Sequence, residues 1–293
     1  MSLKKKVKGV LKFLLNNIPA RKFDVRVVEL VSNELLKGRV AFITGGTSGI
    51  GFHMAKAFLR SGAAVVITGR SEERLRQACI KLSEVETYKS RLFYVIMDNT
   101  RVELFQDCFQ SALERLRENG FQHIDILVNN AGVLGASMPN ATEVEFDKVI
   151  DTNLKGVFFL SQLFGKYMKE NRVEGNILNV GSSSCLRPAT SAYTLSKWGI
   201  RGLTLGLAKN LAPYGITVNG IAPGPTATPM LLKESLDNVT NNGNPIGRYA
   251  LPEEIANMAV ILVSPMGRTI VGDMVYMTGG AGLITYDDMD YSF

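Results

Sequence analysis

Short apolar runs alternate along the chain with longer segments in which hydrophobic residues recur every three or four positions. The short runs have the length and β-branched content of buried strands, and the periodic segments are typical of helices. We expect strands at 40–43, 64–68, 92–96, 125–128, 177–180, 216–218 and 274–276. We expect helices from a glycine-rich turn to about 59, and at 72–83, 101–118, 143–169, 192–212 and 252–263.

This alternation has a topological consequence. Neighbouring parallel strands need long crossover connections, and helices between successive strands supply them. The predicted strands are almost continuously apolar, as expected of a sheet that helices cover on both faces. The chain shows no internal repeat and no low-complexity linker. The sequence therefore predicts an α/β fold, a single doubly wound Rossmann domain with a seven-stranded parallel sheet, over residues 37–293.

Residues 1–36 follow a different pattern. Apolar residues recur at three- and four-residue spacing while most lysines fall on other faces, which predicts a basic amphipathic helical extension. Residues 1–22 carry a charge of +7 within a chain of net charge +6, so the remainder is close to neutral at −1. Two interpretations stay open. The extension packs against the body or another subunit, which is the simpler one, or residues 1–22 make a peripheral contact with an anionic membrane.

Composition excludes several classes of protein. A nearly neutral body argues against a nucleic-acid-binding surface. No apolar run is long enough to span a bilayer, and Lys12 interrupts the stretch that resembles a signal peptide. The three cysteines, Cys79, Cys108 and Cys185, lie far apart and form no CxxC pair. We therefore expect reduced thiols, no metal site and a cytoplasmic protein, with peripheral contact at the inner face of a membrane through the extension as the open alternative.

A glycine-rich turn follows the first predicted strand. Residues 44–51 read TGGTSGIG and lead directly into a helix. Glycines let the backbone approach a pyrophosphate, and the free N–H groups at a helix N-terminus favour that anion. A glycine-rich turn alone is a weak signal. Its position between the first strand and the first helix of an alternating fold predicts a dinucleotide site.

The end of the second strand bears on cofactor choice. Proteins that bind NAD commonly place an acidic residue there to bind the ribose 2′-hydroxyl. Here the strand ends with Gly69 and Arg70, and a guanidinium suits a 2′-phosphate in charge and geometry. Glu72 and Glu73 follow Ser71 as first-turn acids of the next helix. The pattern favours NADP(H) over NAD(H), the alternative being an ordinary surface arginine.

Tyr193 and Lys197 lie four residues apart within the helix predicted over 192–212. This spacing places both side chains on one helix face. A tyrosine of pKa near 10 is a poor base at neutral pH, and a neighbouring cation lowers that pKa. By itself such a pair is common on exposed helices, so its meaning depends on its surroundings.

Six motifs occur in order at the ends of predicted strands or within helices, and together they resemble the short-chain dehydrogenase/reductase family over about residues 37–280. They are the turn at 44–51, Asn-Asn-Ala-Gly at 129–132, Asn153, Ser182, Tyr193-x-x-x-Lys197 and Pro223-Gly224.

The resemblance implies roles for these residues. Tyr193 would exchange a proton with the substrate oxygen, Lys197 would lower its pKa and hold the nicotinamide ribose, and Ser182 would bind the substrate oxygen. Asn153 would hold a water in a proton relay. Ser183 and Ser184 compete with Ser182, because only eleven positions separate Ser182 from Tyr193, about two fewer than in many relatives. The implied cofactor-binding residues are Gly45, Thr47, Ser48, Gly49, Ile50, Gly51, Arg70, Asp98, Asn99, Asn130, Ala131, Gly132, Tyr193, Lys197, Pro223, Gly224 and Thr228.

The expected function is an NADP(H)-dependent oxidoreductase that transfers a hydride between nicotinamide and a carbonyl or secondary alcohol. A catalytically silent NADP(H)-binding sensor or scaffold is the alternative, although all four catalytic residue types are present. A sugar-nucleotide epimerase or dehydratase would need a larger C-terminal substrate domain. The long helices at 143–169 and 192–212 resemble those that pair subunits in relatives, which predicts a homotetramer or homodimer. The loop at 225–245 is expected to cover a small-molecule substrate with an apolar lid.

Overall fold

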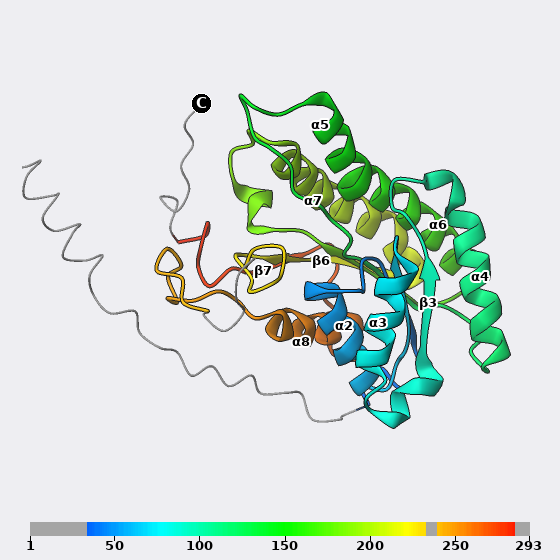
Figure 1. The fold of residues 1–293 in the computed structure, drawn as a ribbon. Coiled ribbons are helices and arrows are strands. Elements are labelled where there is room, and N and C mark those ends of the chain that lie inside the picture. The colour runs from blue at the N-terminus through cyan, green and yellow to red at the C-terminus, as the bar shows by residue number, and fades with distance from the viewer. Residues whose placement is uncertain (1–33, 233–238, 285–293) are drawn as a thin grey trace, which may run out of the picture.

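A computed structural model describes residues 34–232 and 239–284 of the chain. Seven parallel strands form one sheet in the order β3-β2-β1-β4-β5-β6-β7 (Figure 1). The strands are β1 (Val40–Ile43), β2 (Ala64–Gly69), β3 (Leu92–Ile96), β4 (Ile126–Asn129), β5 (Asn176–Val180), β6 (Thr217–Pro223) and β7 (Met274–Met277). The predicted strands and their parallel arrangement are confirmed.

Helices cover both faces of the sheet (Figure 1). The helices are α2 (Gly49–Arg60), α3 (Glu72–Leu82), α4 (Phe105–Glu118), α5 (Glu143–Ile150), α6 (Gly156–Glu170), α7 (Ala192–Leu211) and α8 (Pro252–Val263). The pleat sends alternate strand residues to opposite faces, as β1 shows. Ala41 and Ile43 lie in the core beneath α2, α3 and α8, whereas Val40 and Phe42 lie in the core beneath α4, α6 and α7.

The strand order reverses at β1, which lies between β2 and β4. The chain winds outward from this point in both directions. In doubly wound folds, the loops on the two sides of such a reversal diverge, and ligands bind between them at the carboxyl edge of the sheet. Figure 1 shows the loops after β4, β5 and β6 gathered on the left-hand side of the molecule.

The segment expected as a helix over 143–169 is helical from Glu143 to Glu170, but it contains a turn that the sequence did not predict. A π-helical turn, Asp151–Lys155, separates α5 from α6. Such turns often mark functional sites. The periodicity of apolar residues runs through this turn, so the pattern could not reveal that Asn153 forms hydrogen bonds with a loop outside the helix.

The chain joins the core at Leu36. This side chain is fully buried, and the Leu36 N–H donates to the Ser61 carbonyl at 2.8 Å. The helical extension expected over 1–36 lies outside the described residues except for 34–36, and so does the suggested contact through 1–22. Among the helices that the structure describes, none combines the length and apolar character needed to cross a membrane.

Candidate active site

The turn after β1 is fixed to the end of β4 by hydrogen bonds. The Thr44 hydroxyl accepts from the backbone N–H groups of Asn130 and Ala131, both at 3.0 Å. The Asn130 side-chain amide donates to the carbonyls of Thr44 at 2.9 Å and Gly45 at 3.1 Å. The amide of Asn130, expected to line the cofactor, thus holds the turn in shape through its side chain.

Two of the glycines in this turn are required by packing. A Cβ atom on Gly51 would lie 2.4 Å from both the Gly45 carbonyl oxygen and the Asn130 amide nitrogen. A Cβ atom on Gly46 would lie 2.6 Å from the Ile67 side chain in β2. Any larger residue would push the turn away from β2 or β4, so the tight turn depends on glycine at both positions.

The N-terminus of α2 faces the end of the sheet without a side-chain cap. Ser48 is the N-cap residue, and its hydroxyl accepts no hydrogen bond from the first turn of the helix. The Thr228 side chain, in the loop after β6, lies near Gly49, whose Cβ would stand 3.5 Å from it. The first N–H groups of α2 are thus available to an anion held between the two loops.

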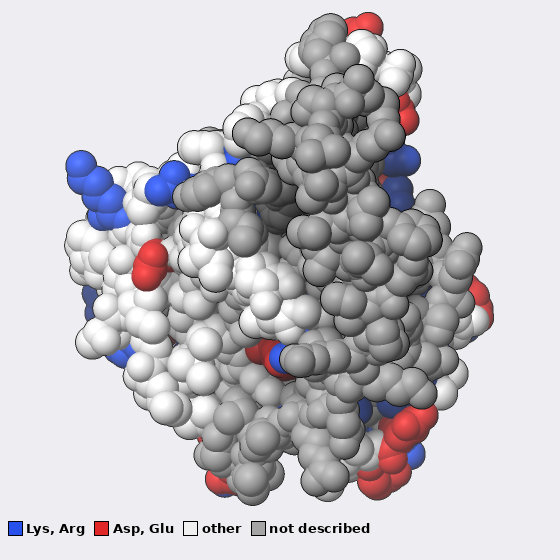
Figure 2. All heavy atoms as spheres, turned by 90° about the vertical axis from the view of Figure 1, so that its left-hand side faces the viewer, with Lys and Arg blue, Asp and Glu red and all other residues white. Residues whose placement is uncertain are grey.

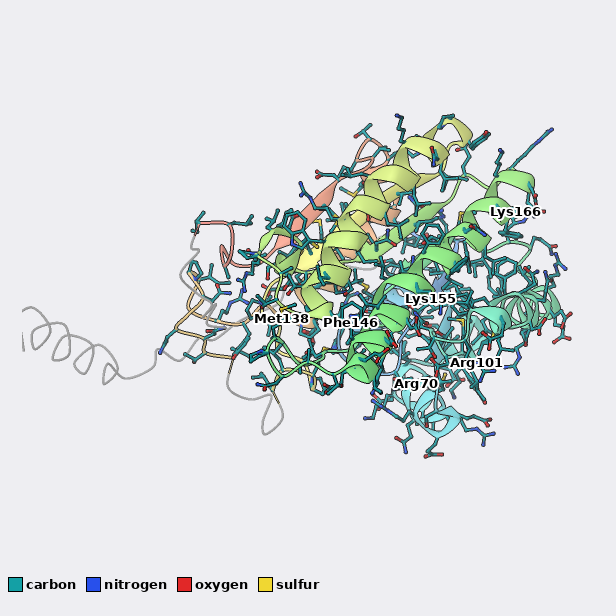
Figure 3. All side chains as sticks on the ribbon, turned by 90° about the horizontal axis from the view of Figure 1, so that it is seen from above. Arg70, Arg101, Met138, Phe146, Lys155 and Lys166 are labelled. Atoms are coloured by element: carbon teal, nitrogen blue, oxygen red, sulfur yellow. The ribbon has the colours of Figure 1, made fainter. Side chains whose placement is uncertain are left out.

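Arg70 lies at the end of β2 and is exposed (Figure 3). It forms no ion pair with another described residue. A Cβ atom on the neighbouring Gly69 would lie 3.0 Å from the Thr47 methyl group, so Gly69 allows the glycine turn to approach β2 closely. Arg70 therefore directly follows the residue of β2 that lies against the turn.

Of the two polar residues after β3, Asp98 has hydrogen-bond partners within the protein and the Asn99 amide nitrogen has none among the described residues. One Asp98 carboxylate oxygen accepts from the Thr100 backbone N–H and hydroxyl, both at 2.9 Å. Asn99 is 6% exposed, and its amide nitrogen has no hydrogen-bond partner among the described residues. A buried amide donor without a partner costs free energy unless a ligand accepts from it.

Tyr193 lies at the start of α7, whose first turn is capped by the Ser191 hydroxyl. The Tyr193 phenol interacts with the Ser182 side chain after β5, and this interaction lowers the pKa of the phenol. The Ser182 hydroxyl also accepts from the Ser184 N–H at 3.1 Å. Of the three adjacent serines considered from the sequence, Ser182 is therefore the one paired with the phenol.

Lys197 is 5% exposed and donates from Nζ to the Val180 carbonyl at 2.8 Å. Burial lowers the pKa of Lys197 to about 8. Its ammonium lies 5.5 Å from the centre of the Tyr193 ring, and its hydrogen bond goes to Val180 and not to the phenol. Burial raises the pKa of Tyr193, and the interaction with Ser182 opposes that rise. The expected lowering of this pKa by the lysine is thus wrong for this arrangement.

Asn153 is 1% exposed and binds the loop after β4. Its carbonyl oxygen accepts from the Val133 N–H at 2.8 Å. Its amide nitrogen donates to the Val133 carbonyl at 2.9 Å and to the Ser196 hydroxyl at 3.3 Å. Both amide hydrogens have protein partners, so the side chain holds the π-helical turn, the loop and α7 together.

Comparison with known proteins agrees with this architecture. Residues 39–238 match the short chain dehydrogenase family. The chain belongs to the short-chain dehydrogenase family. It is 36% identical over 254 residues to a 3alpha-hydroxysteroid dehydrogenase of Mediterraneibacter gnavus, covering 84% of this chain and 98% of that protein.

Two solved structures extend the comparison. A 3-ketoacyl-(acyl-carrier-protein) reductase of Brucella melitensis complexed with NADH has a TM-score of 0.75 and 30% identity, covering 85% of this chain and 100% of that one. An actinorhodin polyketide ketoreductase variant with NADPH has a TM-score of 0.75 and 30% identity, covering 84% and 97%. As a short-chain dehydrogenase, the chain is an oxidoreductase that acts on CH–OH or C=O groups with NAD(P).

Sequence reasoning missed two residues of this short-chain dehydrogenase site. Thr44 organises the glycine turn, and its only signal was its place directly before the glycines. Cys185 is fully buried, and its Sγ donates to the Lys197 carbonyl at 3.1 Å. Burial raises the pKa of the Cys185 thiol, which keeps it protonated. Cys185 thus ties the loop after β5 to α7 between Ser182 and Tyr193.

Proposed function

We propose that this short-chain dehydrogenase is an NADP(H)-dependent reductase of carbonyl compounds, or dehydrogenase of secondary alcohols, with Tyr193 as acid and base. The observation that carries this proposal is the grouping of Tyr193, Ser182 and the buried Lys197, in which Ser182 lowers the pKa of the phenol and the Lys197 ammonium lies 5.5 Å from the centre of its ring. These three side chains stand at the carboxyl edge of the sheet, where β5 ends. A silent sensor would not need a phenol, a hydroxyl and an ammonium gathered there.

The chemistry divides between the cofactor and the protein. When bound, the nicotinamide supplies or accepts the hydride. In reduction, the Tyr193 hydroxyl donates its proton to the substrate oxygen, and in oxidation the phenolate accepts it. Ser182 donates a hydrogen bond to the same oxygen and stabilises the charge that develops there. Lys197 holds positive charge below the phenol, and Asn153 positions the loop and helix that carry these groups.

The residues present fit a dinucleotide. The uncapped N-terminus of α2 would hold the pyrophosphate, with Gly45, Thr47, Ser48, Ile50 and Gly51 shaping the turn. The unpartnered amide of Asn99 supports a contact with the adenosine half, where Asp98, Asn130, Ala131 and Gly132 also lie. Pro223, Gly224 and Thr228 would line the nicotinamide end. Two contacts support this: the Gly224 N–H donates to β7, which holds this loop at the carboxyl edge, and the Thr228 side chain lies near Gly49 in the glycine turn.

NADP(H) is the proposed cofactor in preference to NAD(H). The two solved relatives named above hold NADH in one case and NADPH in the other, so the family does not decide between them. Support comes from the exposed Arg70, which has no ion pair with a described residue and directly follows the residue of β2 that lies against the turn. A guanidinium there compensates the charge of a 2′-phosphate.

The enzyme is proposed to act as a homotetramer or homodimer. Exposed large apolar side chains lie along α5, α6 and α7. Such a concentration of exposed apolar side chains is typical of an interface between proteins. These are Val144, Phe146, Phe158, Phe159, Trp198 and Leu205. Pairing of these helices around a twofold axis would bury them. Light scattering at micromolar concentration should give a mass of two or four chains, and a monomer would contradict this.

Replacement of Tyr193 tests the central proposal. Tyr193→Phe removes the proton and keeps the ring, so turnover of any accepted carbonyl should fall by about a hundredfold or more. The variant should bind NADPH as the parent protein does, which fluorescence titration of the nicotinamide would check. Near-parental turnover in the variant would refute the assignment of Tyr193. In the same titration, tighter binding of NADH than NADPH would refute the cofactor preference.

A further inference from the structure

The described parts of the loops at the carboxyl edge of the sheet are poor in charge. The described segments 133–142, 183–191, 224–232, 239–250 and 278–284 contain only two charged side chains, Arg187 and Arg248. Arg187 is 8% exposed. The Arg248 guanidinium forms a two-pronged pair with the Glu254 carboxylate at 2.8 and 2.9 Å. Figure 2 faces this edge, and much of its described surface is neither acidic nor basic.

The same loops expose large apolar side chains instead. Six of them define what we term the apolar rim: Leu134, Met138, Met230, Leu231, Ile246 and Ile284, which are 49%, 53%, 50%, 46%, 44% and 76% exposed. Single exposed hydrophobic residues are ordinary on protein surfaces. A group of them contributed by loops that meet at one edge indicates a binding surface.

Backbone contacts connect these loops to one another and to Tyr193. The Met138 N–H donates to the Thr190 carbonyl at 2.9 Å, and Ser137 forms a β-bridge with Ser191, two residues before Tyr193. The loop after β4 therefore borders the start of α7.

The remaining loops meet on the other side of the rim. A Cβ atom on Gly282 would lie 3.0 Å from the Arg187 side chain, so the segment after β7 reaches the loop that carries Ser182. A Cβ atom on Gly279 would lie 2.7 Å from the Ile246 side chain. The segments after β5, β6 and β7 thus adjoin one another at the edge where Tyr193 and Ser182 lie.

We propose that the substrate is a neutral ketone or secondary alcohol with a bulky apolar body, and that the apolar rim binds this body while Tyr193 and Ser182 bind the oxygen. This inference rests on the proposed function. A thioester carried on coenzyme A or phosphopantetheine brings phosphates that favour accessible cations. Among the described loop residues, one arginine is buried and the other is paired with Glu254. A sugar needs convergent polar groups, for which exposed Met138 and Leu231 are poor partners.

A graded series of ketones tests this proposal with the full chain and NADPH. The probes are cyclohexanone, 2-decalone and 5α-androstane-3,17-dione, compared with acetoacetyl-coenzyme A and with 2,3-butanedione as a small reactive carbonyl. If the rim binds the apolar body, kcat/KM should rise roughly tenfold with each stage of ring enlargement, as expected when added methylene groups are buried. Acetoacetyl-coenzyme A should be reduced less efficiently than the steroid.

Rim variants make the test specific. Met138→Gln and Ile246→Gln should each lower the ratio of kcat/KM for the steroid over cyclohexanone by about fivefold or more, because each removes apolar contact with the larger body. Ile80→Gln is the matched control, because Ile80 is 68% exposed on α3, away from this edge, and the ratio should stay constant. Melting temperatures of the three variants equal to that of the parent protein would establish that the fold is retained.

Two outcomes separate the proposals. Reduction of 2,3-butanedione with no gain along the ring series, or a higher kcat/KM for acetoacetyl-coenzyme A, would overturn the substrate class and leave the proposed function standing. Absence of NADPH oxidation with every probe, together with identical behaviour of Tyr193→Phe, would instead count against the proposed function itself.

Discussion

The two sides of Tyr193 are built on different principles. On the cofactor side, the turn after β1 is held by hydrogen bonds from Thr44 and Asn130 and by glycines that leave no room for a Cβ atom. On the substrate side, long loops present apolar side chains whose identity is not fixed by such contacts. One side therefore depends on backbone geometry and the other on side-chain composition. This difference explains how one scaffold can keep a cofactor while its substrate changes.

The strongest test of the cofactor side, whose backbone is held rigidly, is Gly51→Ala. The added methyl group would meet the Gly45 carbonyl and the Asn130 amide at 2.4 Å, so the turn must move. We expect NADPH binding to weaken by about a hundredfold or more, since overpacking of a fixed backbone is costly. Titration of nicotinamide fluorescence would measure this. Gly202→Ala in α7 is the control, because its Cβ meets nothing within 4 Å, and affinity within twofold of the parent is expected there.

Thr44→Val tests whether hydrogen bonds, rather than shape, hold the turn. Valine keeps the volume of threonine but leaves the N–H groups of Asn130 and Ala131 without an acceptor. The free energy of unfolding should fall by about 2 kcal/mol, the cost of burying unsatisfied donors. Urea denaturation would measure it. Thr44→Ser retains the hydroxyl, and a loss as large as that of the valine variant would show that the methyl group matters instead.

Tyr193 and Lys197 lie between the two sides, and the kcat/KM that depends on them should change with pH. Burial lowers the pKa of Lys197 to about 8 and raises that of Tyr193 above its usual value. Below pH 8 the lysine is charged, and the phenol keeps its proton throughout this range. If reduction needs the ammonium, kcat/KM should fall about tenfold per pH unit above pH 8.

Lys197→Arg separates this explanation from others. Arginine stays charged throughout the range, so any activity that the variant retains should lose its fall above pH 8. An unchanged pH profile in the variant would assign the ionisation to another group. Oxidation of an alcohol should show the opposite trend, because it needs the phenolate and therefore speeds up as the pH rises.

The sequence predicted the fold and the positions of the site residues more completely than their interactions. Strand positions followed from short apolar runs, because a sheet buried on both faces demands them. The π-helical turn at Asn153 was missed, since a hydrogen bond to Val133 leaves no periodic signature. The structural role of Asn130 was missed for a similar reason. Both side chains act on a segment distant in sequence, and no local pattern records such a contact.

The electrostatic expectation failed for a physical reason that is specific to Tyr193 and Lys197. Spacing of four residues predicts that the two side chains share a helix face, and they do. It does not predict that Lys197 would turn toward the Val180 carbonyl, nor that burial would dominate both pKa values. The spacing along the helix therefore predicted that the two side chains lie together, whereas their pKa values depend on burial by other parts of the chain.

Arg70 gives the smallest expected effect, and it tests whether the rigid side also selects the cofactor. Its guanidinium is exposed, so a pair with a 2′-phosphate would be worth about 1 kcal/mol or roughly fivefold in Kd. Arg70→Ala should therefore weaken NADPH about fivefold and leave NADH unchanged, because NADH lacks the phosphate. Arg74→Ala, on the exposed surface of α3, is the matched control for general charge attraction. Equal weakening by both variants would assign the effect to net charge, which salt should then screen. If NADPH and NADH weakened equally in Arg70→Ala alone, the guanidinium would be acting on a group that the two cofactors share.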